Sequence, residues 1–217
     1  EVLAAEPTAA VLMTWYRNNT AHVLALPSLI AFLLENRRTP LPIKRLERMV
    51  ETIFPYPAWE LHIRTAPGDT ARWVGHLTAC GLVRDSSAGL RPPPADSPES
   101  RRLHLLAGII RQTMERQYIV LSLLTRTGAE APTRGELKAQ SQRIAHKTAR
   151  LCGINAPEFF DQRLFDGFVD KLIDDGVVFE QGDAENRRLG YSPVLDDVMR
   201  ASVRVIDSEF RHAVLSN

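Results

Sequence analysis

The feature that most constrains the fold of this sequence is an order of local signals that occurs twice. In each half an amphipathic helical pattern ends at a glycine and is followed by a short apolar segment and a turn. The two glycines, Gly81 and Gly176, stand 95 residues apart. Glycine commonly ends a helix because it adopts the left-handed conformation without a steric cost. Helix, helix, hairpin is the outline of a winged helix, so the pattern is compatible with a tandem duplication of that unit.

In the first half, four apolar residues share the spacing i, i+3, i+4, i+7, namely Leu46, Met49, Val50 and Ile53. This spacing predicts one apolar face on a helix of about three turns. Asp69 or Thr70 can cap a second helix, which ends at Gly81. The segment Leu82–Arg91 contains a Ser-Ser-Ala-Gly turn between apolar residues, which predicts a short hairpin.

The second half gives the same order of elements. Thr133 and Glu136 have the spacing of a capping box and predict the start of a helix. The residues expected on its inner face are Leu137, Ile144, Thr148 and Leu151. A second helix is predicted from about Pro157 to Asp175, and Val177–Tyr191 is expected to form a hairpin. Ser192-Pro193 then predicts the start of a terminal helix, whose expected inward residues are Val194, Val198 and Val205.

A Pro- and Ser-rich stretch between the halves cannot continue a helix and is interpreted as a linker, residues 92–99. We therefore expect an N-terminal helical subdomain over 1–91 and a C-terminal helical subdomain with a hairpin over 100–217. A long helix from about Ser100 to Thr125 would join them, with a stripe of Leu105, Ile109, Met114, Tyr118, Leu121 and Leu124. The predicted fold class is mainly α, with two helical subdomains that each carry a short β-hairpin. Duplication and chance recurrence of a common outline both fit this pattern.

Composition excludes some classes of function. The chain of 217 residues has 27 Lys and Arg against 26 Asp and Glu, and 44% of its residues are hydrophobic. These values are typical of a globular protein and show no overall excess of basic residues for nucleic-acid binding. Cys80 and Cys152 are 72 residues apart, a spacing that favours neither a disulfide scaffold nor a zinc site.

Motifs that carry chemistry are sparse. The sequence contains no G-x-G-x-x-G, no G-x-x-x-x-G-K-[ST] and no G-x-S-x-G. His76 and Cys80 have the i, i+4 spacing of a metal-chelating pair, but a metal site needs more than two ligands, and packing of His76 beside Trp73 is the favoured interpretation. We expect no catalytic residue, no metal site and no cofactor.

An acidic cluster marks the second predicted helix of the C-terminal half: Asp161, Asp166, Asp170, Asp174 and Asp175. Most of these positions alternate with the apolar stripe, which favours a solvated helix face over a general acid/base pair or a cation site. Residues 158–175 hold six acidic side chains against Arg163 and Lys171. Phosphates would repel such a helix, so the electrostatics argue against binding to DNA.

The apolar segment Ala21–Leu34 falls short of the roughly 20 apolar residues that a membrane span needs. A basic run follows it, made up of Arg37, Arg38, Lys44, Arg45 and Arg48. Together they predict either contact with an anionic membrane surface or, as the favoured interpretation, a core helix with a solvated end. The chain begins with Glu1 and has no signal-peptide pattern, from which we expect a piece of a longer parent.

Polar residues interrupt the first predicted helix at Arg17, Asn18, Asn19 and His22. Amides and imidazoles inside an apolar segment need hydrogen-bond partners, so we predict an interdomain contact there, with a functional pocket as the alternative. The run Trp15–Ala31 resembles the stretch that follows the catalytic domain in bacterial membrane-associated glycerol-3-phosphate 1-O-acyltransferases. The run Gly153–Asp161, with Arg163-Leu164-Phe165 and Phe168, is similar to the C-terminal signature of the same family.

This resemblance implies a parent enzyme that transfers an acyl group from acyl-CoA or acyl-carrier protein to glycerol 3-phosphate, the first step of phospholipid synthesis. The family uses a His-x-x-x-x-Asp pair, in which His is the general base. None of the six His residues has Asp five positions later, so the resemblance supplies no catalytic residue to this chain.

The hypothesis from sequence is therefore a non-catalytic C-terminal region that packs on the upstream acyltransferase domain and aids membrane or carrier docking. The expected location is peripheral, at the cytoplasmic face of the inner membrane, with the chain by itself soluble. The alternative is a stand-alone tandem winged-helix protein that binds a protein or nucleic-acid partner.

Overall fold

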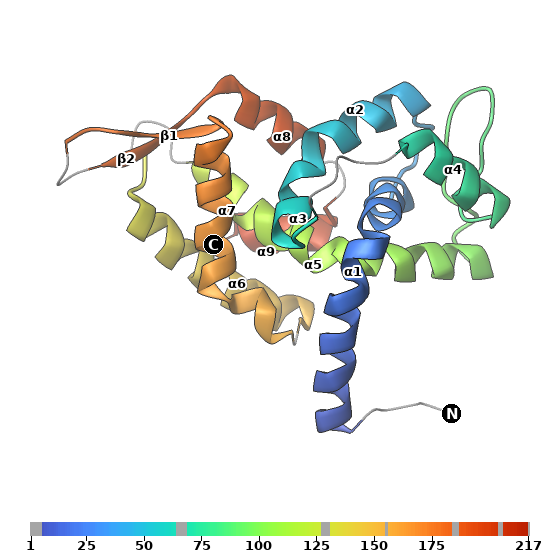
Figure 1. Ribbon diagram of the computed structural model, residues 1–217, viewed down its shortest axis with the longest axis horizontal. Helices are drawn as coiled ribbons and strands as arrows, with labels where there is room; N and C mark the ends of the chain where they lie inside the picture. The colour runs from blue at the N-terminus through green and yellow to red at the C-terminus, as the bar shows by residue number, and fades with distance from the viewer. Residues whose placement is uncertain are drawn as a thin grey trace.

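The computed structural model describes residues 6–63, 69–126, 131–154, 156–183, 187–203 and 206–216, with the side chains at 7, 8, 10–19, 157 and 201 outside the description. The helical elements are α1 (Pro7–Glu35), α2 (Ile43–Ile53), α3 (Pro55–Glu60), α4 (Thr70–Ala79), α5 (Pro98–Arg126), α6 (Arg134–Cys152), the 3-10 helix η1 (Pro157–Phe160), α7 (Gln162–Asp174), α8 (Pro193–Val203) and α9 (Ser208–Leu215). The strands are β1 (Val178–Gln181) and β2 (Arg188–Tyr191). The predicted mainly helical fold with a small antiparallel sheet is confirmed (Figure 1).

Two long helices, α1 and α5, form the centre of the molecule and pack against each other. Residues 25–34 of α1 are all buried, as are residues 113–124 of α5. A helix segment that is buried on every side belongs in a protein core. The core interpretation of the Ala21–Leu34 segment is therefore confirmed for residues 25–34, whereas His22 and Val23 are exposed. Within the described residues, no helix is both long enough and apolar enough to cross a membrane.

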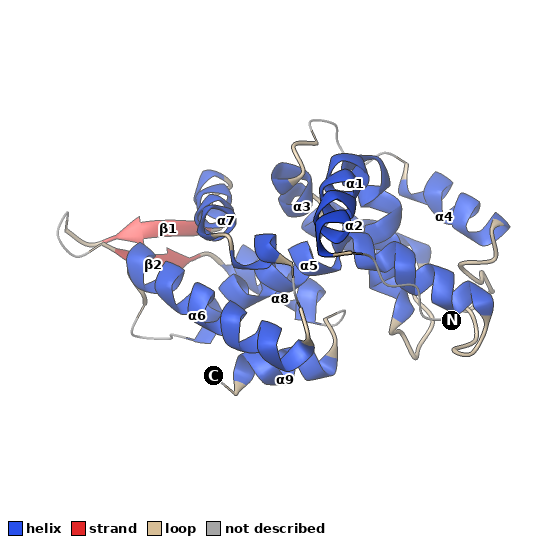
Figure 2. Ribbon diagram, turned by 90° about the horizontal axis from the view of Figure 1, so that it is seen from below, coloured by secondary structure: helices blue, strands red, loops and turns tan. Residues whose placement is uncertain are grey.

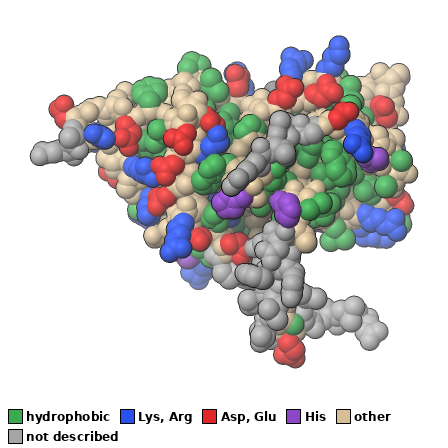
Figure 3. Space-filling view, viewed as in Figure 1, with side chains coloured by type: hydrophobic (Ala, Val, Ile, Leu, Met, Phe, Trp, Pro, Cys, Tyr) green, Lys and Arg blue, Asp and Glu red, His purple; other side chains and the backbone are tan. Residues whose placement is uncertain are grey.

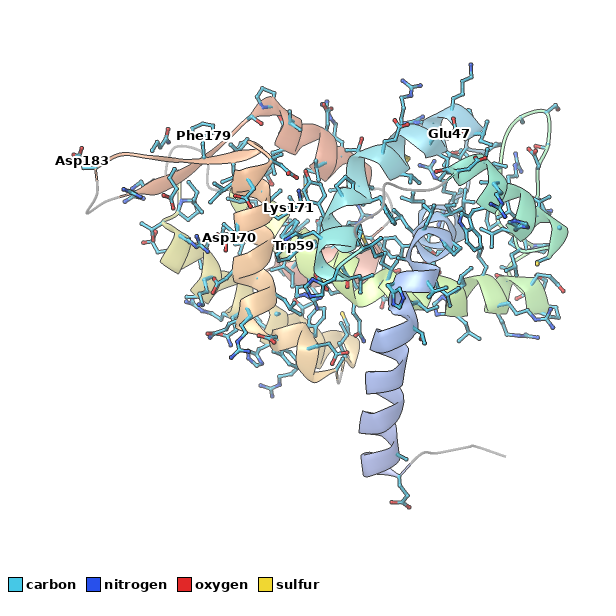
Figure 4. The ribbon with its side chains drawn as sticks, in the orientation of Figure 1. Glu47, Trp59, Asp170, Lys171, Phe179 and Asp183 are labelled. Carbon is cyan, nitrogen blue, oxygen red and sulfur yellow. The ribbon has the colours of Figure 1, made fainter. Side chains whose placement is uncertain are left out.

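Buried apolar side chains from both halves form one continuous cluster. Besides the packing of α1 on α5, one contact between the halves joins α3 and α7, which are neighbours in Figure 2. Tyr56 and Phe168 make an edge-on ring contact with centroids 5.7 Å apart. Trp59 lies on Gly167, where an added Cβ would overlap the indole ring. Figure 4 shows Trp59 on the side of α3 that faces α7. The division at 92–99 stays a prediction.

The capping predictions are confirmed in both halves. Gly81 has φ +73° and Gly176 has φ +67°. The residue after Gly81 donates its N–H to the carbonyl of Leu77 at 2.8 Å, and the residue after Gly176 donates to that of Leu172 at 2.9 Å. These bonds close the last turn of α4 and of α7 in the same way. The capping box of Thr133 and Glu136 is also present.

The two hairpins differ. In the second half β1 pairs antiparallel with β2, with Val178 opposite Tyr191, as predicted. In the first half the structure has isolated bridges in place of strands, one between Arg84 and Arg91 and one between Leu41 and Leu90. The first hairpin is therefore shorter than predicted, and a winged-helix duplication is not confirmed.

Several local predictions were wrong. The helix expected from Pro157 to Asp175 is interrupted at Asp161, whose backbone is extended (ψ 115°) and whose carboxylate accepts the N–H of Arg163. Asp161 thus caps α7 instead of continuing η1. Three residues expected on inner faces are exposed: Leu105 (72%), Leu151 (67%) and Val194 (51%). At the start of α8, Leu195 takes the inward position; the predicted Val205 lies outside the described residues.

Candidate interdomain face and its buried polar network

The middle of α5 carries a run of polar side chains that are buried: Thr113, Glu115, Arg116 and Gln117. Arg116 forms an ion pair with Glu60 at the end of α3, and both side chains are at least nine-tenths buried. Thr113 Oγ1 also donates to Glu60 Oε1, at 2.8 Å. Arg116 Nη1 reaches the carbonyl oxygen of Glu158 at 3.4 Å. This network joins α3, α5 and η1 at one point of the molecule.

A cleft of about 230 Å³ opens next to this network. It is lined by Ala21, Glu60, Leu61, His62, Ile109, Gln112, Thr113, Arg116, Glu158 and Leu164. Residues from α1, α3, α5 and α7 thus meet around it. His62 has φ +55°, an uncommon conformation for a residue with a Cβ, so the chain after α3 turns sharply at the edge of the cleft.

The predicted contact residues lie at the root of the projecting part of α1. Figure 1 shows the first turns of α1 extending away from the body of the molecule. The side chains of Arg17, Asn18 and Asn19 lie outside the described residues, whereas His22 is exposed. Ala21, one residue before His22, lines the cleft. The structure thus places the neighbour of His22 at the cleft, and the role of the four residues stays a prediction.

Apolar side chains lie exposed close to the same root. Val23 is 62% exposed and Trp59 is 36% exposed. Figure 3 shows an apolar area beside the projecting helix, whereas acidic and basic side chains are interspersed over the end of the molecule that carries α6 and α7. Exposed apolar groups rimmed by polar ones are typical of a surface that contacts another protein surface. We call the surface formed by Ala21–Val23, Trp59–His62 and Gln112 the α1-root face.

A second buried carboxylate closes the far end of α1. Glu35 Oε1 lies 2.8 Å from Arg111 Nη2, and Glu35 Oε2 lies 3.2 Å from His104 Nδ1. The guanidinium of Arg111 also covers the Phe32 ring, with 5.7 Å to its centroid. One turn along α5, the pKa of Glu115 is raised to about 7. Burial is the largest cause, Arg111 opposes it, and the charges of Asp207 and Glu35 add to it.

Three acidic residues of α7 and its C-terminal end form ion pairs. Asp166 pairs with Lys138 at 2.5 Å and Asp170 pairs with Arg134 at 2.6 Å, so α7 is held against α6. Asp175 pairs with Lys171 on α7 itself. Within the described residues, no group of three His, Cys, Asp or Glu side chains is placed to hold a metal ion. The predicted packing of His76 beside Trp73 is confirmed, with ring centroids 5.8 Å apart.

Sequence analysis missed Glu60 and Arg116. The available signal was the polar group Glu115–Gln117 directly before the apolar segment 118–121 of the same helix, because buried charges require partners. The identity of the partner could not be read from the pattern, since Glu60 lies 56 residues away on a short helix that begins with two prolines at Pro55 and Pro57.

The comparison with protein families matches residues 1–181 to the glycerol-3-phosphate acyltransferase C-terminal region. The chain belongs to this family. The glycerol-3-phosphate acyltransferase of Pseudomonas entomophila (strain L48) is 35% identical over 98% of the chain, and that of Pseudomonas putida (strain W619) is 34% identical over 98%. The protein of the same name from Ectopseudomonas mendocina (strain ymp) is 31% identical over 99%.

The chain spans 26% of the length of each of these relatives. The matched region includes the α1-root face, both buried carboxylates and all of α7. No solved structure matches the chain. The resemblance stated from the two sequence motifs is therefore confirmed, and the findings support it over the stand-alone winged-helix alternative.

Proposed function

We propose that this chain is the non-catalytic C-terminal region of an enzyme that transfers an acyl group to the 1-hydroxyl of glycerol 3-phosphate. The observation that carries the proposal is the family match over residues 1–181 together with the 26% coverage of relatives named glycerol-3-phosphate acyltransferase. The remaining three quarters of such a parent would supply the catalytic domain. The acyl donor would be acyl-CoA or acyl-carrier protein, as the family resemblance implies.

The work of the region in this proposal is to pack against the catalytic domain through the α1-root face. Two features support this role. Helix α1 extends from the body at this face, and Val23 and His22 are exposed beside it. The Arg116–Glu60 network beneath fixes the position of α3 relative to α5. A rigid, partly apolar surface of this kind is suited to a constant partner within one polypeptide.

Docking of the parent on a membrane or an acyl carrier is the second part of the proposal. The basic run that begins at Arg37 continues along α2, where Lys44, Arg45 and Arg48 are all exposed together with Ile43. Cationic side chains next to an exposed apolar residue favour an anionic surface, and each contributes on the order of 1 kcal/mol near such a membrane. A peripheral position at the cytoplasmic face would follow.

The test is an acylation assay with labelled glycerol 3-phosphate and acyl-CoA. It compares the full-length parent, the 217-residue chain alone, and a parent truncated so that it lacks this region. We expect activity in the first alone. Acyl transfer by the chain itself would overturn the non-catalytic role, and full activity of the shortened parent would overturn the packing role.

His22→Ala in the full-length parent should lower both activity and thermal stability, with His212→Ala on α9 as the matched control. His212 is exposed and distant in sequence from the α1-root face. Equal behaviour of the two variants would contradict the contact assigned to His22. Asn18→Ala, tested in the same way, measures whether the predicted contact also includes a residue whose side chain the structure does not describe.

A further inference from the structure

A groove between α5 and α6 carries positive charge that neither the interdomain face nor the ion pairs of α7 use. Its volume is about 380 Å³, and its described lining residues are Leu123, Arg126, Gln140, Arg143, Ile144 and Lys147. Three of these are cations and none of those described is acidic. The volume is within the range of small-molecule sites, roughly 300–1,000 Å³.

The cations of the groove are placed by the fold. Arg126, in the last turn of α5, donates to the carbonyl oxygens of Leu215 at 3.0 Å and Val214 at 3.4 Å, so the end of α9 holds its guanidinium. Arg143 and Lys147 lie four residues apart and therefore on one face of α6. Within the described part of the chain, no acidic side chain pairs with either of them.

The cations at the start of α6 differ from those that line the groove. Arg134 and Lys138, which precede Arg143 on the same helix by about two and a half turns and one and a half turns, are each paired with an aspartate of α7. A helix that neutralises its cations on one side and leaves them unpaired around a groove on another gains by binding an anion there. Arg and Lys bind phosphate through short, charge-assisted hydrogen bonds.

The groove floor adds a second requirement. Leu123 and Ile144 are each less than a tenth exposed and form the apolar base between the cations. The carbon skeleton of a bound anion would cover the part of this base that is still exposed, which a bare anion would not do. We infer that the groove between α5 and α6 binds a phosphomonoester with a small apolar skeleton, with its phosphate on Arg126, Arg143 and Lys147 and its carbon atoms against Leu123 and Ile144. This inference goes beyond the proposed function and does not depend on it.

The experiment uses the 217-residue chain and monohexyl phosphate as the probe, with binding followed by titration calorimetry at low salt. The test variant is Arg143→Gln with Lys147→Gln, and the matched control is Arg150→Gln, an exposed cation on the same helix outside the groove lining. We expect the double variant to weaken binding at least tenfold and the control to change it less than twofold. Inorganic phosphate should bind at least tenfold more weakly than hexyl phosphate.

Four outcomes would overturn the inference. The first is the absence of hexyl phosphate binding at millimolar concentration, and the second is equal binding by the double variant and the Arg150 control. The third is equal affinity for inorganic phosphate, because the apolar base would then have no role. The fourth is cosedimentation of the chain with phosphatidylglycerol vesicles, lost in the double variant, without binding of hexyl phosphate. That result would assign the cations to a lipid surface. Thermal melts of every variant establish that folding is unchanged.

Discussion

The two halves of the molecule have a similar order of elements but close their hairpins differently. In each half a long helix is followed by shorter helices, a left-handed glycine and an antiparallel pairing. In each half, a residue just before α2 or α6 also forms a backbone contact with the second arm of the hairpin. Leu41 pairs with Leu90 in the first half, and Leu189 donates its N–H to the carbonyl of Pro132 at 2.8 Å in the second. The shared backbone bonds explain why one pattern of sequence signals occurs twice.

The difference lies in the side chains that cover the pairing. In the second half, Phe179 lies over Gly190 on the neighbouring strand, where a Cβ would come within 2.5 Å of the ring. Aromatic cover of a strand glycine stabilises a short ladder. The first half has polar residues at the corresponding turn and keeps only single bridges. Caps thus determine where each hairpin begins, whereas cross-strand packing determines how far it extends.

The largest expected effect comes from cutting the network that attaches the first half to α5. Arg116→Met leaves the carboxylate of Glu60 buried without its cation. Removal of one partner of a buried ion pair costs about 3–5 kcal/mol of unfolding free energy. Urea denaturation of the chain measures this loss. The control is Arg200→Met, which breaks an exposed pair with Asp197 and should cost less than about 1 kcal/mol; similar costs for both would show that the network does not join the halves.

The second effect depends on pH and concerns the contact of α5 with α9. Burial raises the pKa of Glu115 from 4.5 to about 7, so the folded state binds its proton more tightly than the unfolded state. The stability linked to this group is fully present below pH 4.5 and is lost as the pH rises through 7. Each unit of pKa shift corresponds to about 1.4 kcal/mol, so the loss is about 3 kcal/mol.

Glu115→Gln removes this titration. The variant should match the unsubstituted 217-residue chain in unfolding free energy near pH 4.5 and exceed it by up to about 3 kcal/mol at pH 8. Urea denaturation at unit steps of pH measures the difference between the two proteins. A constant difference across this range would contradict the buried, proton-binding carboxyl.

A third effect tests the packing between the halves. Gly167→Ala should place a methyl group against Trp59, and overpacking of this kind costs about 1–3 kcal/mol despite the better helix propensity of alanine. Gly75→Ala on α4 is the matched control, since nothing lies within 4 Å of its added Cβ. That change should stabilise the chain by about 1 kcal/mol. Thermal melts of both variants give the comparison, and stabilisation by both would mean that Trp59 does not lie on α7 in solution.

Local signals predicted most of this fold. The glycine ends of α4 and α7 and the capping box of α6 depend on contacts within a few residues, so their sequence patterns are sufficient. The second hairpin pairs residues that are still near in sequence, from Gln181 with Arg188 to Val178 with Tyr191. The break at Asp161 was not predicted, because its carboxylate can either continue an acidic face or cap α7. The polar network was also beyond reach, since Glu60 and Arg116 meet only through tertiary packing.

The smallest expected effect sharpens the comparison of the halves at their shared caps. Gly81→Ala and Gly176→Ala each place a Cβ on a left-handed residue, which costs about 1–2 kcal/mol. The added Cβ at Gly81 would make only an ordinary contact of 3.4 Å with Glu99 Cγ, and that at Gly176 meets nothing within 4 Å. Backbone strain is therefore the common term, and the two costs should agree within about 0.5 kcal/mol. Urea denaturation measures both. Unequal costs would mean that the two glycines end their helices for different reasons, because the side-chain surroundings are open at each. Equal losses of unfolding free energy would mean that the halves resemble each other in the backbone hydrogen bonds that end α4 and α7. Their difference would then lie in the hairpins that follow.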